Sequence, residues 1–132
     1  MRIFILEDDP ARHIVFKREL AKYNITICED VDTAVKCLLT EGPFDLFFWD
    51  HDLGLSQMMD SSLYNTEYEV VKQVNASGCE VFGHLSIHVI HSLNPPGAKN
   101  IAGILPVLSH IEPFIHIDWN VTRDNIDALW PE

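Results

Sequence analysis

The segment that most constrains the fold is an apolar run that ends abruptly in three polar residues. Phe44–Trp49 has the length and composition of a buried strand, and Asp50, His51 and Asp52 follow it before Leu53–Gly54 turns the chain. A strand this apolar is normally covered on both faces, as in the middle of a parallel sheet. In open α/β sheets, ligands bind just beyond the carboxyl ends of such strands. Carboxylates and an imidazole are costly to desolvate there unless a cation or ligand compensates them, so the segment predicts a metal-centred site.

Strand and helix signals alternate along the rest of the chain. We predict strands at Arg2–Leu6, Ile25–Cys28, Phe44–Trp49, Ile87–His91 and Phe114–Asp118. We predict helices from Pro10 to about Lys22, from a cap at Asp32 or Thr33 to Gly42, from about Glu67 to Asn75, around Ile101–Leu105, and from Asp124 to Leu129. This alternation predicts an α/β fold with a five-stranded parallel sheet and right-handed crossovers. No repeat or linker divides the chain, so we expect residues 1–132 to form a single domain.

The charge balance limits the possible partners. The chain has 9 Lys and Arg residues against 20 Asp and Glu residues, which gives a formal net charge of −11. Duplex nucleic acid is therefore not an expected partner, because phosphate contacts along a duplex need clustered Lys and Arg. A small anionic ligand that contains phosphate remains compatible, since a divalent cation inverts the local field.

The cysteines and the apolar runs predict a cytoplasmic location. Cys28, Cys37 and Cys79 are odd in number and form no Cys-x-x-Cys pair, which is typical of reduced, buried thiols. The first apolar run, Ile3–Leu6, is too short for a signal peptide and is followed at once by acidic residues. No run is long enough to span a membrane, so we expect no membrane partner.

Polar clusters follow three of the predicted strands. They are Glu7-Asp8, Asp50-His51-Asp52 and His91-Ser92 with Asn94. Because neighbouring parallel strands end at the same edge of a sheet, we expect these clusters to meet. Oxygen ligands suit Mg²⁺ or Mn²⁺, and an added imidazole shifts the preference toward Mn²⁺, Fe²⁺ or Zn²⁺. Glu7-Asp8 taken alone is also explained by helix capping.

The third cluster has the features of an anion pocket. Ser92 and Asn94 can donate hydrogen bonds to phosphate oxygens, and Gly97 precedes a predicted helix whose free amides favour an anion. A plain turn is the alternative interpretation of the same residues. His88 and His116 lie inside predicted strands, where a hydrogen-bonded core histidine is expected.

Three of these motifs resemble the receiver domain of two-component signalling. Ile5–Pro10 resembles its acidic pair after the first strand, Phe44–Asp50 the strand that ends in its phospho-accepting aspartate, and Ser92 its hydroxyl residue after the fourth strand. The resemblance implies a single doubly wound, receiver-like (flavodoxin-like) domain with strand order 2-1-3-4-5. It also implies that Glu7, Asp8 and Asp50 bind a divalent metal.

Two features depart from the signalling receivers. Receivers carry a lysine at the end of the fifth strand that contacts the phosphoryl group, whereas residues 112–122 contain no Lys or Arg. The segments at 50–54 (DHDLG) and 91–97 (HSLNPPG) instead resemble the cyclic-phosphate-processing, receiver-like branch of the superfamily, which shares both. That resemblance implies chemistry on a cyclic phosphate.

The leading hypothesis is a metal-dependent phosphoesterase, a hydrolase that acts on a cyclic phosphate or cyclic (oligo)nucleotide. Asp8 and Asp50 would hold the metal, with Glu7 and Asp52 as further ligands or beside them. The general acid would be His91 or, as second choice, His51. The candidate catalytic residues are thus His91, His51 and Asp52, and the substrate-binding candidates are Ser92, Asn94 and Gly97. The alternatives are a stand-alone response-regulator receiver phosphorylated on Asp50, and a non-catalytic module that binds a nucleotide or a protein.

Overall fold

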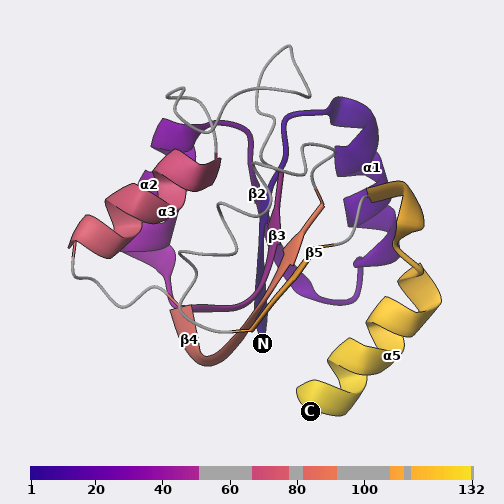
Figure 1. Cartoon of the computed structure of the whole chain (residues 1–132). Helices are drawn as coiled ribbons and strands as arrows, with labels where there is room; N and C mark the ends of the chain where they lie inside the picture. The colour runs from indigo at the N-terminus through magenta and orange to yellow at the C-terminus, as the bar shows by residue number, and fades with distance from the viewer. Residues whose placement is uncertain (51–66, 78–81, 92–107, 112–113, 132) are drawn as a thin grey trace.

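The computed structural model describes residues 1–50, 67–77, 82–91, 108–111 and 114–131. In chain order its elements are β1 (Arg2–Leu6), α1 (Pro10–Glu19), β2 (Asn24–Cys28), α2 (Val31–Glu41), β3 (Phe44–Trp49), α3 (Glu67–Ser77), β4 (Phe82–Ile90), β5 (Leu108–Ile111), the 3-10 helix η1 (Phe114–His116) and α5 (Trp119–Leu129). Figure 1 shows α2 and α3 on one side of the sheet, with α1 and α5 on the other.

The five strands form one parallel sheet in the order β2-β1-β3-β4-β5. This confirms the predicted fold class. Alternate residues of the central strands enter opposite cores, because side chains of a strand alternate between its two faces. Phe47 and Trp49 pack with Leu38 and Val70 on the α2 and α3 side. Phe48 belongs to the second core cluster, on the α1 and α5 side.

Aspartates begin three of the helices. Asp9 caps α1 by accepting the amide of Ala11, and proline stands in the first turn of that helix. Asp118 caps α5 by accepting the amide of Val121. The cap of α2 is Asp30, so the prediction of Asp32 or Thr33 at that position is wrong.

The predicted position of the fifth strand is also wrong. β5 lies earlier, at Leu108–Ile111, and pairs with β4. Residues Phe114–His116 form η1, and Asp118 starts α5 at Trp119 instead of at Asp124. The apolar pattern there has another cause, because Phe114 and Ile117 pack against the α1 and α5 core while Ile115 is 76% exposed. His116 is accordingly exposed and is not a core histidine.

Two of the three cysteines lie in the described part of the chain, and both Cys28 and Cys37 are free and buried. Burial raises the pKa of each thiol, that of Cys37 to about 12. Neither is therefore a ready nucleophile. Among the described helices, none is both long and apolar enough to cross a membrane.

Candidate functional site

Three polar residues stand immediately after three neighbouring strands, and the sheet fixes their backbones. Glu7 follows β1, and its amide donates to the carbonyl of Cys28 at 3.0 Å, so Glu7 still pairs with β2. The amide of Asp50 donates to β1 at 3.1 Å, and the amide of His91 donates to β3 at 2.9 Å. Each residue therefore prolongs the ladder by one hydrogen bond, and the site rests on rigid backbone.

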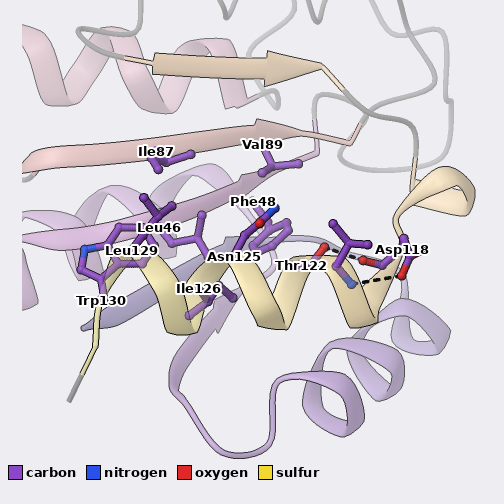
Figure 2. Close-up of a pocket in the computed structure, with 11 residues that line it drawn as sticks. Leu46, Phe48, Ile87, Val89, Asp118, Thr122, Asn125, Ile126, Leu129 and Trp130 are labelled. Atoms are coloured by element: carbon purple, nitrogen blue, oxygen red, sulfur yellow. Dashed lines mark hydrogen bonds between the residues drawn. The ribbon is translucent and has the colours of Figure 1, made fainter.

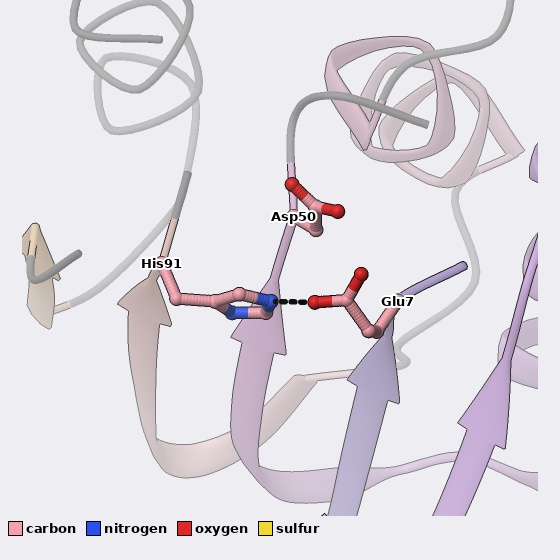
Figure 3. A group of neighbouring side chains, drawn as sticks. All are labelled: Glu7, Asp50 and His91. Carbon is pink, nitrogen blue, oxygen red and sulfur yellow. Dashed lines mark hydrogen bonds and ion pairs between the residues drawn. The ribbon is translucent and has the colours of Figure 1, made fainter. Parts of the chain in front are cut away.

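The side chains of Glu7, Asp50 and His91 converge at this edge (Figure 3). Each offers one potential metal-ligand atom, and these atoms all lie within 4.8 Å of one another. Glu7 and His91 are fully buried, and Asp50 is only 3% exposed. Buried ionisable groups this close together need hydrogen bonds, counter-charges or a ligand to be stable.

The carboxylate of Glu7 accepts hydrogen bonds from His91, Arg12 and two backbone amides. Its Oε1 accepts from His91 Nε2 at 2.9 Å and from Arg12 Nη1 at 3.3 Å, and its Oε2 accepts from the amides of Asp8 at 3.0 Å and Asp9 at 3.1 Å. Burial alone would raise the pKa of Glu7, but the hydrogen bonds from His91 and from the amide of Asp9 outweigh it and hold the pKa below its usual range. Glu7 is therefore ionised at neutral pH.

His91 is held in one orientation by Glu7 and by aromatic rings. The centroid of its ring lies 5.5 Å from that of Phe16, 6.0 Å from that of Phe114 and 6.4 Å from that of Phe48. Burial lowers the pKa of His91, although the carboxylate of Glu7 acts in the opposite direction. The imidazole is thus neutral, and because ionised Glu7 can only accept, the hydrogen is on Nε2.

The other ring nitrogen of His91 is buried without a hydrogen-bond partner in the described structure. With the hydrogen on Nε2, this Nδ1 carries a free lone pair. Unpaired buried polar atoms are rare in folded proteins, and they suggest a functional role or a missing ligand. Beside His91, the carboxylates of Glu7 and Asp50 offer oxygen atoms, which are the ligands that Mg²⁺ and Mn²⁺ prefer. The residues therefore fit a metal ion.

The other predicted site residues are placed as follows. Asp8 lies next to Glu7, is partly buried, and is not one of the three converging side chains. His51, Asp52, Ser92, Asn94 and Gly97 lie outside the described residues, so their predicted roles stay predictions.

Sequence reasoning missed two features of the site. The pairing of His91 with Glu7 joins residues 84 positions apart, and no local pattern reveals it. Arg12 also reaches the site, because the first turn of α1 returns its side chain to Glu7. The sequence could have indicated this contact, since Arg12 is the first basic residue after the acidic run.

A separate apolar cavity of about 330 Å³ lies between α5 and strands β3 and β4 (Figure 2). Phe48 and Val89 line its sheet side, and Ile126 and Leu129 its helix side. Of the described residues that line it, Asp118 is the one with a titratable side chain, and that side chain caps α5. The cavity therefore lacks the chemistry found at the strand ends.

A known protein family matches most of the chain. Residues 1–106 match the model of the family described as "Cyclic-phosphate processing Receiver domain". The chain belongs to this family. Among curated proteins, sequence comparison finds no match to this chain.

Solved receiver domains share the fold. A CheY-like response regulator receiver domain from Methanospirillum hungatei JF-1 is 15% identical, with a TM-score of 0.65 over 97% of this chain and 91% of that one. The receiver domain of a sensor histidine kinase from Pseudomonas aeruginosa PAO1 is 17% identical, with a TM-score of 0.64 over 96% and 94% of the two chains. That structure has a magnesium ion coordinated in its active-site cleft. At these identities the likeness extends to the fold alone.

Signalling receivers carry a lysine after their fifth strand, so the observed position of β5 decides where that residue should be sought in this chain. In this chain β5 ends at Ile111, and the next residue in the sequence is Glu112. No Lys or Arg occurs between Leu108 and Thr122. The departure from signalling receivers therefore holds for the strand that the structure contains.

Proposed function

We propose that the protein is a metal-dependent phosphoesterase that acts on a small cyclic phosphate or cyclic (oligo)nucleotide. The observation that carries the proposal is a buried imidazole, His91, which an ionised carboxylate orients beside Asp50 at the end of the sheet. The description of the family supports the reaction class.

Asp50 and Asp8 are the proposed metal ligands, with Asp52 beside them. Glu7 was also predicted as a ligand, and its carboxylate is one of the converging groups; the hydrogen bond that it accepts from His91 also orients the imidazole. A bound Mg²⁺ or Mn²⁺, or alternatively Zn²⁺ or Fe²⁺, would supply Lewis acidity, which polarises a phosphate and lowers the pKa of water.

His91 is the proposed acid–base residue. Hydrolysis of a cyclic phosphate adds water across one ester P–O bond, so water gives up a proton and the leaving oxygen gains one. Neutral His91 has a free lone pair on Nδ1 and can take up a proton there. The Glu7 carboxylate on Nε2 would stabilise the imidazolium that results, which can then protonate the leaving oxygen. Ser92, Asn94 and the amides near Gly97 are the proposed contacts for the remaining phosphate oxygens, and His51 is the second candidate acid.

The test is turnover by the full chain loaded with Mn²⁺ or Mg²⁺. The substrates are cyclic mononucleotides, 2′,3′-cyclic phosphates, and cyclic di- and trinucleotides. We expect hydrolysis of at least one class, abolished by chelation and by Asp50→Asn. Asp124→Asn, which alters an exposed carboxylate on α5, is the control and should keep full activity. If the wild type hydrolyses none of these compounds, the enzymatic proposal is wrong. If the protein binds one of these compounds tightly without hydrolysing it, and chelation does not affect the binding, the protein is instead a binding module.

A second candidate is a receiver phosphorylated on Asp50. It is supported by the place of Asp50 at the end of β3 and by the shared fold of solved receivers. Acetyl phosphate with Mg²⁺ should then give an acid-stable, base-labile adduct that Asp50→Asn abolishes. Absence of the adduct would remove this candidate.

A further inference from the structure

We propose that Arg12 binds the anionic oxygens of the phosphate group at this site. The inference rests on the proposed function for the class of ligand. The residue itself is assigned from the contacts of its guanidinium group.

Arg12 is fixed at the edge of the site by contacts with Glu7, Asp9 and Phe114. Its Nη1 donates to Glu7 Oε1 at 3.3 Å, on the same oxygen that accepts from His91. The guanidinium carbon lies 4.9 Å from the centroid of the Phe114 ring, so the ring supports the cation. The charge of Arg12 also acts on His91: burial is the main cause that lowers the pKa of His91, and the positive charge of Arg12 lowers it further.

Within the described part of the chain, most of the hydrogen-bonding capacity of Arg12 is unused. A guanidinium has five N–H donors, and the bond to Glu7 uses one. Nε also forms an ion pair with Asp9 Oδ2, but their separation of 3.9 Å is beyond hydrogen-bond distance, so this contact uses no donor. The side chain is 16% exposed, so it is positioned by the protein and still open on one side. A planar fork with free donors matches two oxygens of a phosphate.

An anion at this site needs such a cation. Glu7 and Asp50 are acidic, Asp8 lies beside them, and the whole chain carries a formal net charge of −11. No Lys or Arg follows the fifth strand before Arg123. A phosphate that approached these carboxylates would be repelled unless a metal ion and a nearby cation offset them, and Arg12 contacts the site directly.

The competing explanation is that Arg12 only neutralises buried Glu7. Under that explanation Arg12→Gln lowers the melting temperature but leaves the affinity for phosphate unchanged. Under ours, the affinity falls whether or not the melting temperature changes. Arg12→Lys separates the two further, because it keeps the charge beside Glu7 and loses the planar fork.

The experiment measures the affinity for inorganic phosphate by calorimetry, with the full chain and Mg²⁺. Arg12→Gln should weaken binding about tenfold or more, the usual scale for a charge-assisted hydrogen bond. Arg12→Lys should give an intermediate loss, and it also serves as the test if Arg12→Gln does not fold. Arg18→Gln is the matched control, because Arg18 is on the same helix and pairs with Glu19 on the surface. Its affinity should equal that of the wild type.

Two outcomes would overturn the inference: no phosphate binding by the wild type at millimolar concentration, or wild-type affinity in folded Arg12 variants. Failure of the proposed function is distinguishable from both. If phosphate binding depends on Arg12 but no cyclic phosphate is hydrolysed, the function is wrong and the anion site stands. If cyclic phosphates are hydrolysed and the Arg12 variants keep the wild-type KM, the function stands and the role of Arg12 is wrong.

Discussion

His88 and His91 lie three residues apart on the same strand and its extension, and both are buried, yet their surroundings differ. Both ring nitrogens of His88 are paired, with Trp49 Nε1 donating to Nδ1 at 2.9 Å and Ser86 Oγ lying 3.1 Å from Nε2. Its ring stacks on Phe47 with 4.5 Å between centroids. His91 has one nitrogen on a carboxylate and the other without a described partner.

The comparison shows that burial alone does not separate a structural histidine from a functional one. Burial lowers the pKa of both, that of His88 to about 3. What differs is the second ring nitrogen, which is hydrogen-bonded within the core at His88 and has no described partner at His91. The prediction that His88 is a hydrogen-bonded core residue is confirmed.

The largest expected effect is on turnover. His91→Gln should lower the rate of cyclic-phosphate hydrolysis by about 10²–10⁴, the usual scale for loss of a general acid or base. The affinity for Mn²⁺ should change little, because the carboxylates remain. His116→Gln, at an exposed histidine of η1, is the control and should keep the wild-type rate. A folded His91→Gln protein with undiminished turnover would remove His91 from the mechanism and leave His51 as the candidate.

The opposite behaviour is expected at His88. His88→Phe keeps a ring beside Phe47 but leaves the Trp49 N–H and the Ser86 hydroxyl without this partner. Each buried group left unpaired costs about 1–3 kcal/mol, so with two such groups the free energy of unfolding should fall by roughly 2–6 kcal/mol. Urea denaturation at pH 7 measures it. Turnover per folded molecule should stay at the wild-type level, and a selective loss of turnover would break the distinction between the two histidines.

The third prediction concerns the metal. A ligand that binds only the folded protein stabilises it by about 2.7 kcal/mol at a hundred times its dissociation constant. We therefore expect Mn²⁺ to raise the melting temperature, and Asp50→Asn to remove the shift. His88→Phe should melt lower but retain the shift, because His88 is buried and is not among the converging ligand atoms. A wild-type melting curve that millimolar Mn²⁺ does not move would count against the site.

The same contrast explains how far the sequence could be read. The apolar run Phe44–Trp49 predicted a central strand correctly, and the polar residues at the strand ends predicted correctly that Glu7, Asp50 and His91 meet at one edge. The fifth strand was misplaced because its apolar pattern does not identify a strand. Phe114 lies in a 3-10 helix and Ile117 follows it, and both still bury apolar surface against the core. The partners of a buried side chain are set by tertiary packing. No sequence period therefore reveals that His88 meets Trp49 while His91 meets Glu7.

The smallest expected effect is the change in unfolding free energy per pH unit that the protonation of His88 causes. Its pKa is lowered from 6.5 to about 3 by burial, so the folded state binds a proton less readily than the unfolded state. The stability that depends on neutral His88 is complete above pH 6.5 and falls by about 1.4 kcal/mol per pH unit as the pH drops toward 3. Carboxylates add their own loss at acidic pH, but they do so equally in His88→Phe. The difference in unfolding free energy between wild type and His88→Phe should therefore shrink as the pH falls from 6.5. A difference that stays constant between pH 7 and pH 4 would mean that His88 accepts a proton without loss of its core contacts.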